Sequence, residues 1–348
     1  MTASTTGVYH RTYKSELALR QTTISRARLV LALAGLVSLP FVLSPFWMTV
    51  ANQVGIAVIG AIGLNILTGY TGQISLGQGG FLAVGAYTSG LLVTRMGLPT
   101  VVAIAAAIVV TALVGAFFGL PALRLKGLYL AISTLASQFI ILWVVRNWDF
   151  VTGGVDSLVV PAPEIAGYTV RTDFAWFWII LVVAALCTVT ARNLMRTGLG
   201  RAFMAVRDQD IAASTIGIDI VRYKILAFAI SSGFVGLAGA LTAHYRSIVT
   251  FERFTLDVSV LYLAMIIVGG LGSILGSILG GTFMIVMPAG ISQLGQSLQG
   301  SFLAQQLPAI QHGIFGLVII LFLIFEPRGL ARVWQRAKDY FRLWPFRY

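Results

Sequence analysis

Amides and hydroxyls are the polar side chains that interrupt the apolar stretches of this sequence. Those near the frequent glycines of NILTGYTGQISLGQGG and in one later apolar run are Asn65, Gln73, Ser75, Gln78, Ser133 and Ser137. At membrane depth, backbone that departs from a helix must line a cavity or be covered by protein. The pattern therefore predicts a hydrogen-bonding path for a small polar molecule. Tight helix packing through the same residues is the alternative, and both can hold at once.

Other chemistries are excluded by what the sequence lacks. The glycine run GGLGSILGSILGG is not followed by the lysine and hydroxyl of a phosphate-binding loop, so the chain is not expected to hydrolyse ATP. Cys187 is the one cysteine, and the three histidines are scattered, so no metal site is expected. No charged residue interrupts the interior of the apolar runs, whereas ion-driven carriers usually need such residues. We expect a protein that is not an enzyme and is driven from outside the lipid.

A long polar island at residues 192–224 separates two of the apolar runs. It holds six basic residues: Arg192, Arg196, Arg201, Arg207, Arg222 and Lys224. Its centre predicts two short helices, at about 201–206 and 209–216. Asp208 is expected to cap the second helix, and Asp210 lies in its first turn, where a negative charge is favourable. Ala212 and Ala213 give the helix a slim side, and Gly217 is expected to end it. The slim side predicts that this helix enters a groove on a partner.

The composition and the apolar runs predict the fold class. The 348-residue chain is 57% hydrophobic and 10% charged, which is too apolar for a soluble domain, where about a quarter of residues are charged. A bilayer core about 30 Å thick takes about 20 helical residues to cross. We place spans near 27–46, 49–68, 76–94, 99–120, 127–146, 174–191, 225–245, 258–271, 273–290 and 312–326. The expected fold is an all-α polytopic membrane protein with about ten spans, some of them broken or re-entrant.

The basic residues predict how the chain lies across the membrane, because lysine and arginine concentrate in short cytoplasmic loops. With the N-terminus inside, nineteen of the 24 lysines and arginines fall on the cytoplasmic side. We expect a cytoplasmic tail at 1–26, a transmembrane domain at 27–326 and a basic cytoplasmic tail at 327–348. The net charge of +12 follows from this clustering at the ends of apolar runs, so no nucleic-acid partner is expected.

Two further segments are expected outside the bilayer core. The loop at 147–173 falls on the external side and carries Asp149, Asp156 and Glu164. It is predicted to be either a solvated connector or a docking surface for an external partner. The tail at 327–348 mixes cations with aromatic rings, which predicts an interfacial helix on anionic lipid of the bilayer.

The island also carries a family resemblance. GRAFMAVRDQDIAASTIGID resembles the cytoplasmic coupling loop of ATP-binding-cassette importer permeases, in particular the branched-chain amino acid permease family and its LivM-type subunit. Three further stretches resemble hallmarks of that family: NILTGYTGQISLGQGGFLAVGAY, VTGGVDSL and GGLGSILGSILGG. The likeness runs from about Val50 to Gly329. One departure is Ile211, which stands where importers at large have a glutamate; the acid lies one residue earlier, at Asp210.

The resemblance implies a set of partners and roles. The coupling contacts to a cytoplasmic ATPase subunit, which binds ATP and Mg while this chain binds no cofactor, would be Arg207, Asp208, Asp210, Ala212, Ala213 and Gly217. It also implies a second, LivH-like permease subunit and a periplasmic substrate-binding protein, for which Asp149, Asp156 and Glu164 would be the docking residues. The location implied is the bacterial inner membrane, with transport by alternating access.

The identity of the transported molecule stays open at this point. Branched-chain amino acids are the first expectation, and urea, short amides or other amino acids are alternatives within the family. An alternative of a different class is a self-sufficient channel or ion-coupled carrier. A path lined by hydroxyls, amides and glycines is compatible with many small polar molecules, so it does not identify the cargo.

Overall fold

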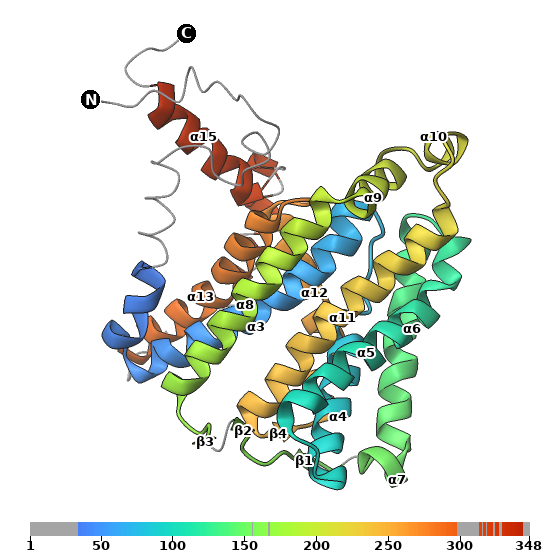
Figure 1. Cartoon of the computed structure of the whole chain (residues 1–348). Coiled ribbons are helices and arrows are strands. Elements are labelled where there is room, and N and C mark those ends of the chain that lie inside the picture. The colour runs from blue at the N-terminus through green and yellow to red at the C-terminus, as the bar shows by residue number, and fades with distance from the viewer. Residues whose placement is uncertain are drawn as a thin grey trace, which may run out of the picture. The chain divides into compact units, whose positions relative to one another are not determined.

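The computed structural model describes residues 34–154, 156–165, 168–297, 313–314, 316–317, 319–322, 324–326 and 329–343. The expected tail at 1–26 and the start of the first expected span lie outside these residues. The chain divides into two compact units, residues 1–49 and 50–348. In the first unit, residues 34–42 are helical and helix α3 begins at Pro45. The second unit holds nearly all the helices labelled in Figure 1.

Long helices follow the apolar runs of the sequence. They are α3 (Pro45–Asn65), α4 (Gln78–Met96), α5 (Thr100–Gly119), α6 (Leu128–Asn147), α8 (Asp173–Arg196), α11 (Ile220–Arg246), α12 (Leu256–Gly269) and α13 (Ile274–Ser297). Among the described residues, six helical segments are long and apolar enough to cross a membrane: Pro45–Tyr70, Thr100–Gly119, Leu128–Asn147, Asp173–Arg196, Ile220–Arg246 and Ile274–Gln293. The chain is therefore a mostly helical, multi-pass membrane protein, and the count of ten spans stays a prediction.

Helices α4, α5 and α11 make the most extensive helix contacts of this unit (Figure 1). Glycines let their backbones meet. A Cβ atom at Gly85 would lie 2.2 Å from the carbonyl oxygen of Gly236, and one at Gly239 would lie 2.2 Å from that of Leu82. Neither position can hold a side chain unless the backbone opposite moves. In lipid, helices associate through such close packing because no hydrophobic effect drives them together.

The first of two helix breaks follows α3. This helix passes into one turn of π-helix, η1 (Ile66–Tyr70), and the chain then runs without helix through residues 72–77 before α4 begins. Gly72 has a φ of +71°, a conformation that favours glycine. The glycine-rich stretch after Asn65 is thus broken, as the sequence predicts.

The second break separates α12 from α13 at residues 270–273, where Gly270 and Gly272 have positive φ angles. The spacing of Gly272, Gly276 and Gly280 is typical of one helix face, but Gly272 lies in the break and only the other two are on α13. A Cβ at Gly276 would lie 2.6 Å from the Gly270 carbonyl oxygen, so α13 packs directly on the end of α12. With 14 residues, α12 is about 21 Å long, short of a full span.

The island and the acidic loop lie at opposite ends of the unit (Figure 1). At one end are α9 (Gly198–Asp208), α10 (Asp210–Thr215) and the start of α15 (Gly329–Leu343). At the other, α7 (Asp149–Thr152) accompanies two antiparallel strand pairs, β1 (Leu158–Val159) with β4 (Ile248–Val249) and β2 (Glu164–Ile165) with β3 (Tyr168–Thr169). Two 3-10 turns are also present, η2 (Pro121–Leu123) and η3 (Phe251–Arg253). This arrangement agrees with a membrane between the two ends.

The close crossing of α4 and α11 gives a testable prediction. Gly85→Ala should lower the free energy of unfolding by about 1–3 kcal/mol, the usual range for overpacking, because the new methyl group meets backbone. Denaturation in detergent, followed by tryptophan fluorescence, measures the change. The matched control is Gly233→Ala on α11, where the nearest atom is Ile108 Cγ2 at 3.5 Å. That variant should be neutral or slightly stabilised, and equal losses in both variants would contradict the close crossing.

Candidate functional site

Asn65 joins the two helix breaks. Its Nδ2 donates to the Ser273 carbonyl oxygen at 2.8 Å and to the Ser277 hydroxyl at 2.7 Å. Its Oδ1 accepts a hydrogen bond from the backbone N–H of Gly272 at 2.9 Å. The residue is 1% exposed, so without these bonds several buried polar groups would lack partners. The Asn65 amide therefore ties the end of α3 to the start of α13.

A second polar cluster surrounds the start of α4. The backbone N–H of Gly79 donates to Ser259 Oγ at 2.7 Å, and that hydroxyl donates to Gln138 Oε1 at 2.6 Å. Gln138 Nε2 in turn donates to the Phe254 carbonyl oxygen at 3.2 Å. The first N–H groups of a helix have no partner within the helix. Here Ser259 of α12 satisfies the N–H of Gly79, and Gln138 of α6 accepts the hydrogen bond of that serine hydroxyl.

The non-helical residues before α4 depend on the same neighbours. The backbone N–H of Leu76 donates to Thr134 Oγ1 at 2.9 Å, and the Gln78 side chain donates from Nε2 to the Gly60 carbonyl oxygen at 3.1 Å. Thr134 and Gln78 are each 1% exposed. These bonds join α3, α6 and the broken segment into one buried unit.

Gln73 differs from its neighbours in having an unused acceptor. Its Nε2 donates to Thr71 Oγ1 at 3.1 Å, but its Oε1 is buried and has no hydrogen-bond partner in the structure. Ser75, nearby, accepts a bond from the Gly77 N–H at 3.3 Å. A buried, unpaired carbonyl oxygen is unusual and suits contact with a ligand or another subunit.

The structure thus brings together four of the six residues predicted for a polar path: Asn65, Gln73, Ser75 and Gln78. All four are buried and make side-chain hydrogen bonds within the protein, and only Gln73 keeps an acceptor, Oε1, without a partner. These bonds agree with the packing interpretation. A role in translocation stays a prediction, and Gln73 is the best placed for it.

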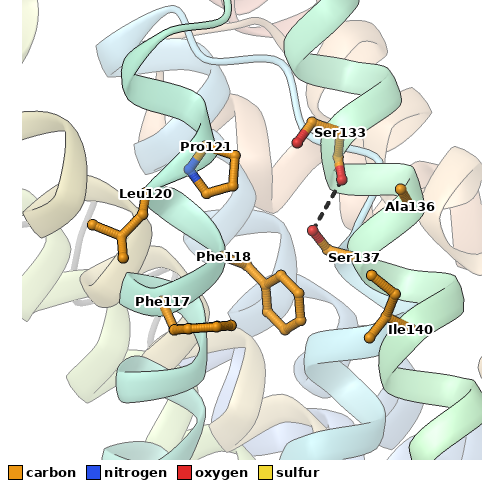
Figure 2. A pocket seen from close by; sticks show the side chains of 8 residues that line it. All are labelled: Phe117, Phe118, Leu120, Pro121, Ser133, Ala136, Ser137 and Ile140. Atoms are coloured by element: carbon orange, nitrogen blue, oxygen red, sulfur yellow. Dashed lines mark hydrogen bonds between the residues drawn. The ribbon is translucent and has the colours of Figure 1, made fainter.

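Ser133 and Ser137 do not belong to this cluster. They line a shallow, mostly apolar cavity of about 320 Å³ between the ends of α5 and α6, beside Phe117 and Phe118 (Figure 2). Ser137 donates its hydroxyl to the Ser133 carbonyl oxygen at 2.9 Å within α6, and this bond is the dashed line in Figure 2. The helix turns by about 100° per residue, so it is the adjacent Thr134 and Gln138 that face the breaks. Ser133 and Ser137 therefore lie apart from the break residues, and their role in a translocation path stays a prediction.

Two short helices form in the island, but their junction differs from the prediction. Asp208 is the last residue of α9 and does not cap α10; Gln209 holds the N-cap position without a side-chain bond. Asp208 Oδ1 instead accepts a hydrogen bond from Arg207 Nε at 2.9 Å. This charge-assisted bond competes with capping for the same oxygen atoms. The predicted cap was therefore wrong.

The predicted stop at Gly217 is confirmed. Gly217 has a φ of +89°, and the bonds from Gly217 N–H to Ser214 and from Ile218 N–H to Ala213 form a Schellman motif.

The slim side predicted for the second helix is not present. Ala213 is buried at 2% exposure while Ala212 is exposed, because adjacent residues point about 100° apart. The outer surface of α10 is formed instead by Ile211 and by Ile216 just after it, each 76% exposed. An exposed apolar pair of this kind is typical of a contact surface.

Asp210, in the first turn of α10, forms an ion pair with Lys126 in the loop before α6, with 2.5 Å between Oδ2 and Nζ. The hydrogen bond from Lys126 lowers the pKa of Asp210 below its ordinary value, and the charge of Lys224 adds to this effect. The pair therefore contributes above the ordinary carboxyl pKa of about 3.9 and is lost as pH falls through the lowered value. At neutral pH it holds α10 against this loop. Nothing in the spacing of the sequence identifies Lys126 as the partner.

The three acids predicted to dock an external partner are all exposed. Asp149 lies in the first turn of α7, Glu164 begins β2, and Asp156 lies in the loop between them. Arg95 at the end of α4 donates to the Phe150 carbonyl oxygen and so holds α7 in place. The docking role stays a prediction. In the described part of the chain, no cluster of histidine, cysteine and acidic side chains could hold a metal ion.

The Asn65 bonds give a prediction about stability. Asn65→Ala removes three buried hydrogen bonds and should lower the free energy of unfolding by about 2 kcal/mol, given the modest value of such bonds within membranes. The control is Asn147→Ala, whose one hydrogen bond to a described residue joins it to Trp143, one turn earlier, on an exposed surface. Denaturation of both variants in mixed micelles measures the difference; a loss below about 0.5 kcal/mol for Asn65→Ala would contradict the link.

The ion pair of α10 gives a prediction about mobility. A spin label at exposed Ser214, placed as Ser214→Cys in a Cys187→Ala background, should become more mobile when Lys126→Asp opposes the charge of Asp210. Adding Asp210→Lys should restore the wild-type spectrum, because the reversed pair can form again. Continuous-wave electron paramagnetic resonance distinguishes these states. Failure of the double reversal to restore order would show that the pair does not hold α10.

Comparisons with known proteins agree with these features. A family described as "Branched-chain amino acid transport system / permease component" matches residues 46–323, which include both breaks, α9 and α10. The chain is 31% identical over 335 residues to the LivM permease protein of Salmonella typhimurium, covering 89% of this chain and 75% of the relative. It is 31% identical over 328 residues to LivM of Escherichia coli, covering 87% and 73%.

A more distant relative carries a different cargo in its name. The chain is 29% identical over 248 residues to the autoinducer 2 import system permease LsrC of Klebsiella pneumoniae, covering 67% of this chain and 66% of the relative. No solved structure gives a significant match. Long apolar helices with paired breaks, and a family match across most of the chain, assign a transport role rather than an enzymatic one. The chain belongs to the permease family of branched-chain amino acid transport systems.

Proposed function

We propose that this chain is one membrane subunit of an ATP-driven importer that carries branched-chain or related amino acids into the cytoplasm of a bacterium. A second, LivH-like permease subunit, cytoplasmic ATPase subunits and a periplasmic binding protein complete the assembly. LivH permeases are among the relatives of this chain, at 23% identity over 295 residues for that of Salmonella typhimurium. ATP and Mg are bound by the ATPase subunits, and this chain alternates between outward-open and inward-open states in the inner membrane.

The proposed topology has ten spans, with both termini, α9 and α10 in the cytoplasm and the strand pairs outside. The support is the placement of the island and the acidic loop at opposite ends of the helices, together with the excess of basic residues on the island side. α15 then lies on the inner leaflet, where its exposed cations and Trp334 meet anionic headgroups.

The outer surface of α10 is the observation that carries the ATPase-coupling role. Ile211 and Ile216 are exposed at an end of the molecule that the topology places in water, and Gly217 ends the helix without a side chain. Two exposed isoleucines on one short helix suit insertion into a cleft of another protein. Ala212, Asp208 and Asp210 lie around this surface and would contact the rim of the cleft.

The cargo follows the names of the relatives and is not decided by the residues of this chain. Asn65, Ser75 and Gln78 are occupied by internal hydrogen bonds, which leaves few groups for recognition. Selectivity therefore rests with the binding protein. The alternatives are urea, short amides or a cargo like that of the LsrC relative, and a self-sufficient channel or carrier that needs no ATPase.

The coupling role is tested with the assembled complex in proteoliposomes. Ile211→Glu and Ile216→Glu, together, should reduce binding of the ATPase by at least about tenfold, because burying two charged side chains in an apolar cleft is strongly unfavourable. Gly217→Trp should have a similar effect by adding bulk. Co-purification of the ATPase and ATP-driven uptake of labelled leucine are measured together.

Leu199→Glu on α9 is the matched control, since Leu199 is also exposed but lies away from α10, and it should leave ATPase binding within about twofold of wild type. Normal ATPase binding by the α10 variants would refute the coupling surface. Uptake of leucine by this chain without ATPase would instead support the carrier alternative. Binding of urea or amides, and not leucine, by the partner binding protein would change the cargo alone.

A further inference from the structure

Arg207 points back toward the helix breaks and not toward the exposed surface of α10. It lies in the last turn of α9, and its Nη1 donates a hydrogen bond to the carbonyl oxygen of Gly69 at 3.0 Å. Gly69 belongs to the π-helical turn that begins the first break. The contact joins residues 138 positions apart in the sequence. Among the described side chains of α9, that of Arg207 brings a charged group to the broken segment.

Two glycines, Gly72 and Gly272, make room for this side chain. A Cβ atom at Gly72 would lie 3.0 Å from Arg207 Cγ, and one at Gly272 would lie 3.0 Å from its Nη1. Gly69 itself has no space for a Cβ, since Asn65 Oδ1 and the Gly272 N–H lie within 2.3 Å of that position. Arg207 therefore rests on the first break with its stem and on both breaks with its guanidinium.

The orientation of the guanidinium is fixed from the other side by Asp208. Asp208 Oδ1 accepts from Arg207 Nε at 2.9 Å, which leaves Nη1 free to point to Gly69. A planar guanidinium can make both bonds at once, whereas a lysine ammonium on its flexible stem has no equivalent pair of fixed donors. The Asp208 carboxylate thus orients Arg207, which explains why it does not cap α10.

We propose that Arg207 is a positioning residue that transmits the movement of α9 and α10 to both helix breaks. Asn65 binds Gly272 and Ser273, so a displacement of Gly69 also acts on the start of α13. The proposal rests on the proposed ATPase-driven function, and it changes the expected role of Arg207 from a contact with the ATPase to a link within the permease. Without Arg207, the ATPase stays bound and still hydrolyses ATP, but hydrolysis drives much less transport.

The test compares Arg207→Met with Arg201→Met in the full chain and in the assembled complex. Methionine keeps the unbranched stem that packs on Gly72 and removes the donors. Arg201 is an exposed residue of the same helix, and its described side-chain bond is a long one of 3.5 Å to the neighbouring Arg196 carbonyl oxygen. Hydrogen exchange on the chain alone reports on the breaks, and proteoliposomes report on uptake and ATP hydrolysis.

In Arg207→Met, amide exchange at residues 69–73 and 271–274 should rise at least fivefold, and leucine uptake per ATP hydrolysed should fall at least tenfold. Retention of the ATPase and the basal rate of hydrolysis should stay within twofold of wild type. Arg207→Lys keeps one donor and should lose only about threefold in uptake per ATP. Arg201→Met should match wild type in every measurement.

Equal exchange in Arg207→Met and Arg201→Met would overturn the link, and so would loss of the ATPase from the Arg207→Met complex, which would make Arg207 a docking contact. These outcomes are distinct from failure of the proposed function. In that case the wild-type complex would show no ATP-driven uptake, while exchange in the chain alone would still support or overturn the contact between Arg207 and the breaks.

Discussion

Backbone polar groups that leave a helix inside a membrane protein must find partners within the protein, because the surrounding lipid offers none. This requirement organises the centre of the structure. At the first break the N–H groups of Leu76 and Gly79 are satisfied by hydroxyls from α6 and α12, and at the second the Gly272 N–H is satisfied by the Asn65 amide. The side chains that accept these bonds fix how four helices meet. The breaks are therefore joined to several helices by hydrogen bonds, although they depart from regular helix.

The sequence predicts the helices and the breaks well for a physical reason. A run of about 20 apolar residues has one stable conformation in lipid, and a cluster of glycines with amides is compatible with few structures other than a break. The direction in which each side chain points is a different matter. Helix α6 carries apolar residues on all sides, so its sequence does not indicate which of four successive polar residues, at 133, 134, 137 and 138, face inward. Thr134, Ser137 and Gln138 are all buried, and of these Thr134 and Gln138 bond to the polar groups around the first break, whereas Ser137 bonds within its own helix.

Errors in the island have a related cause. Asp208 has two available partners, the N–H groups of the next helix and the Arg207 side chain beside it, and the sequence alone does not rank them. The Gly69 carbonyl oxygen decides which partner Asp208 binds, because it lies 3.0 Å from Arg207 Nη1 in the folded chain and so helps to hold the guanidinium in place. Likewise, Ala212 and Ala213 are equivalent in the sequence, and packing against the rest of the protein distinguishes them. The contact that orients Arg207 joins residues 138 positions apart, so the sequence near Asp208 does not reveal it.

The two charged attachments of the island, one on each helix, differ in strength. Asp210 and Lys126 form a pair whose lysine side chain is 68% exposed, and such surface pairs contribute about 0–1 kcal/mol. The Arg207 bond to Gly69 is partly buried and charged, and hydrogen bonds of that kind contribute about 1.5–3 kcal/mol. α10 is therefore the weakly held helix and α9 the firmly held one. Under the proposed coupling role, a partner bound to Ile211 and Ile216 would draw α10 away from Lys126, while the Arg207 contact would keep α9 joined to the breaks.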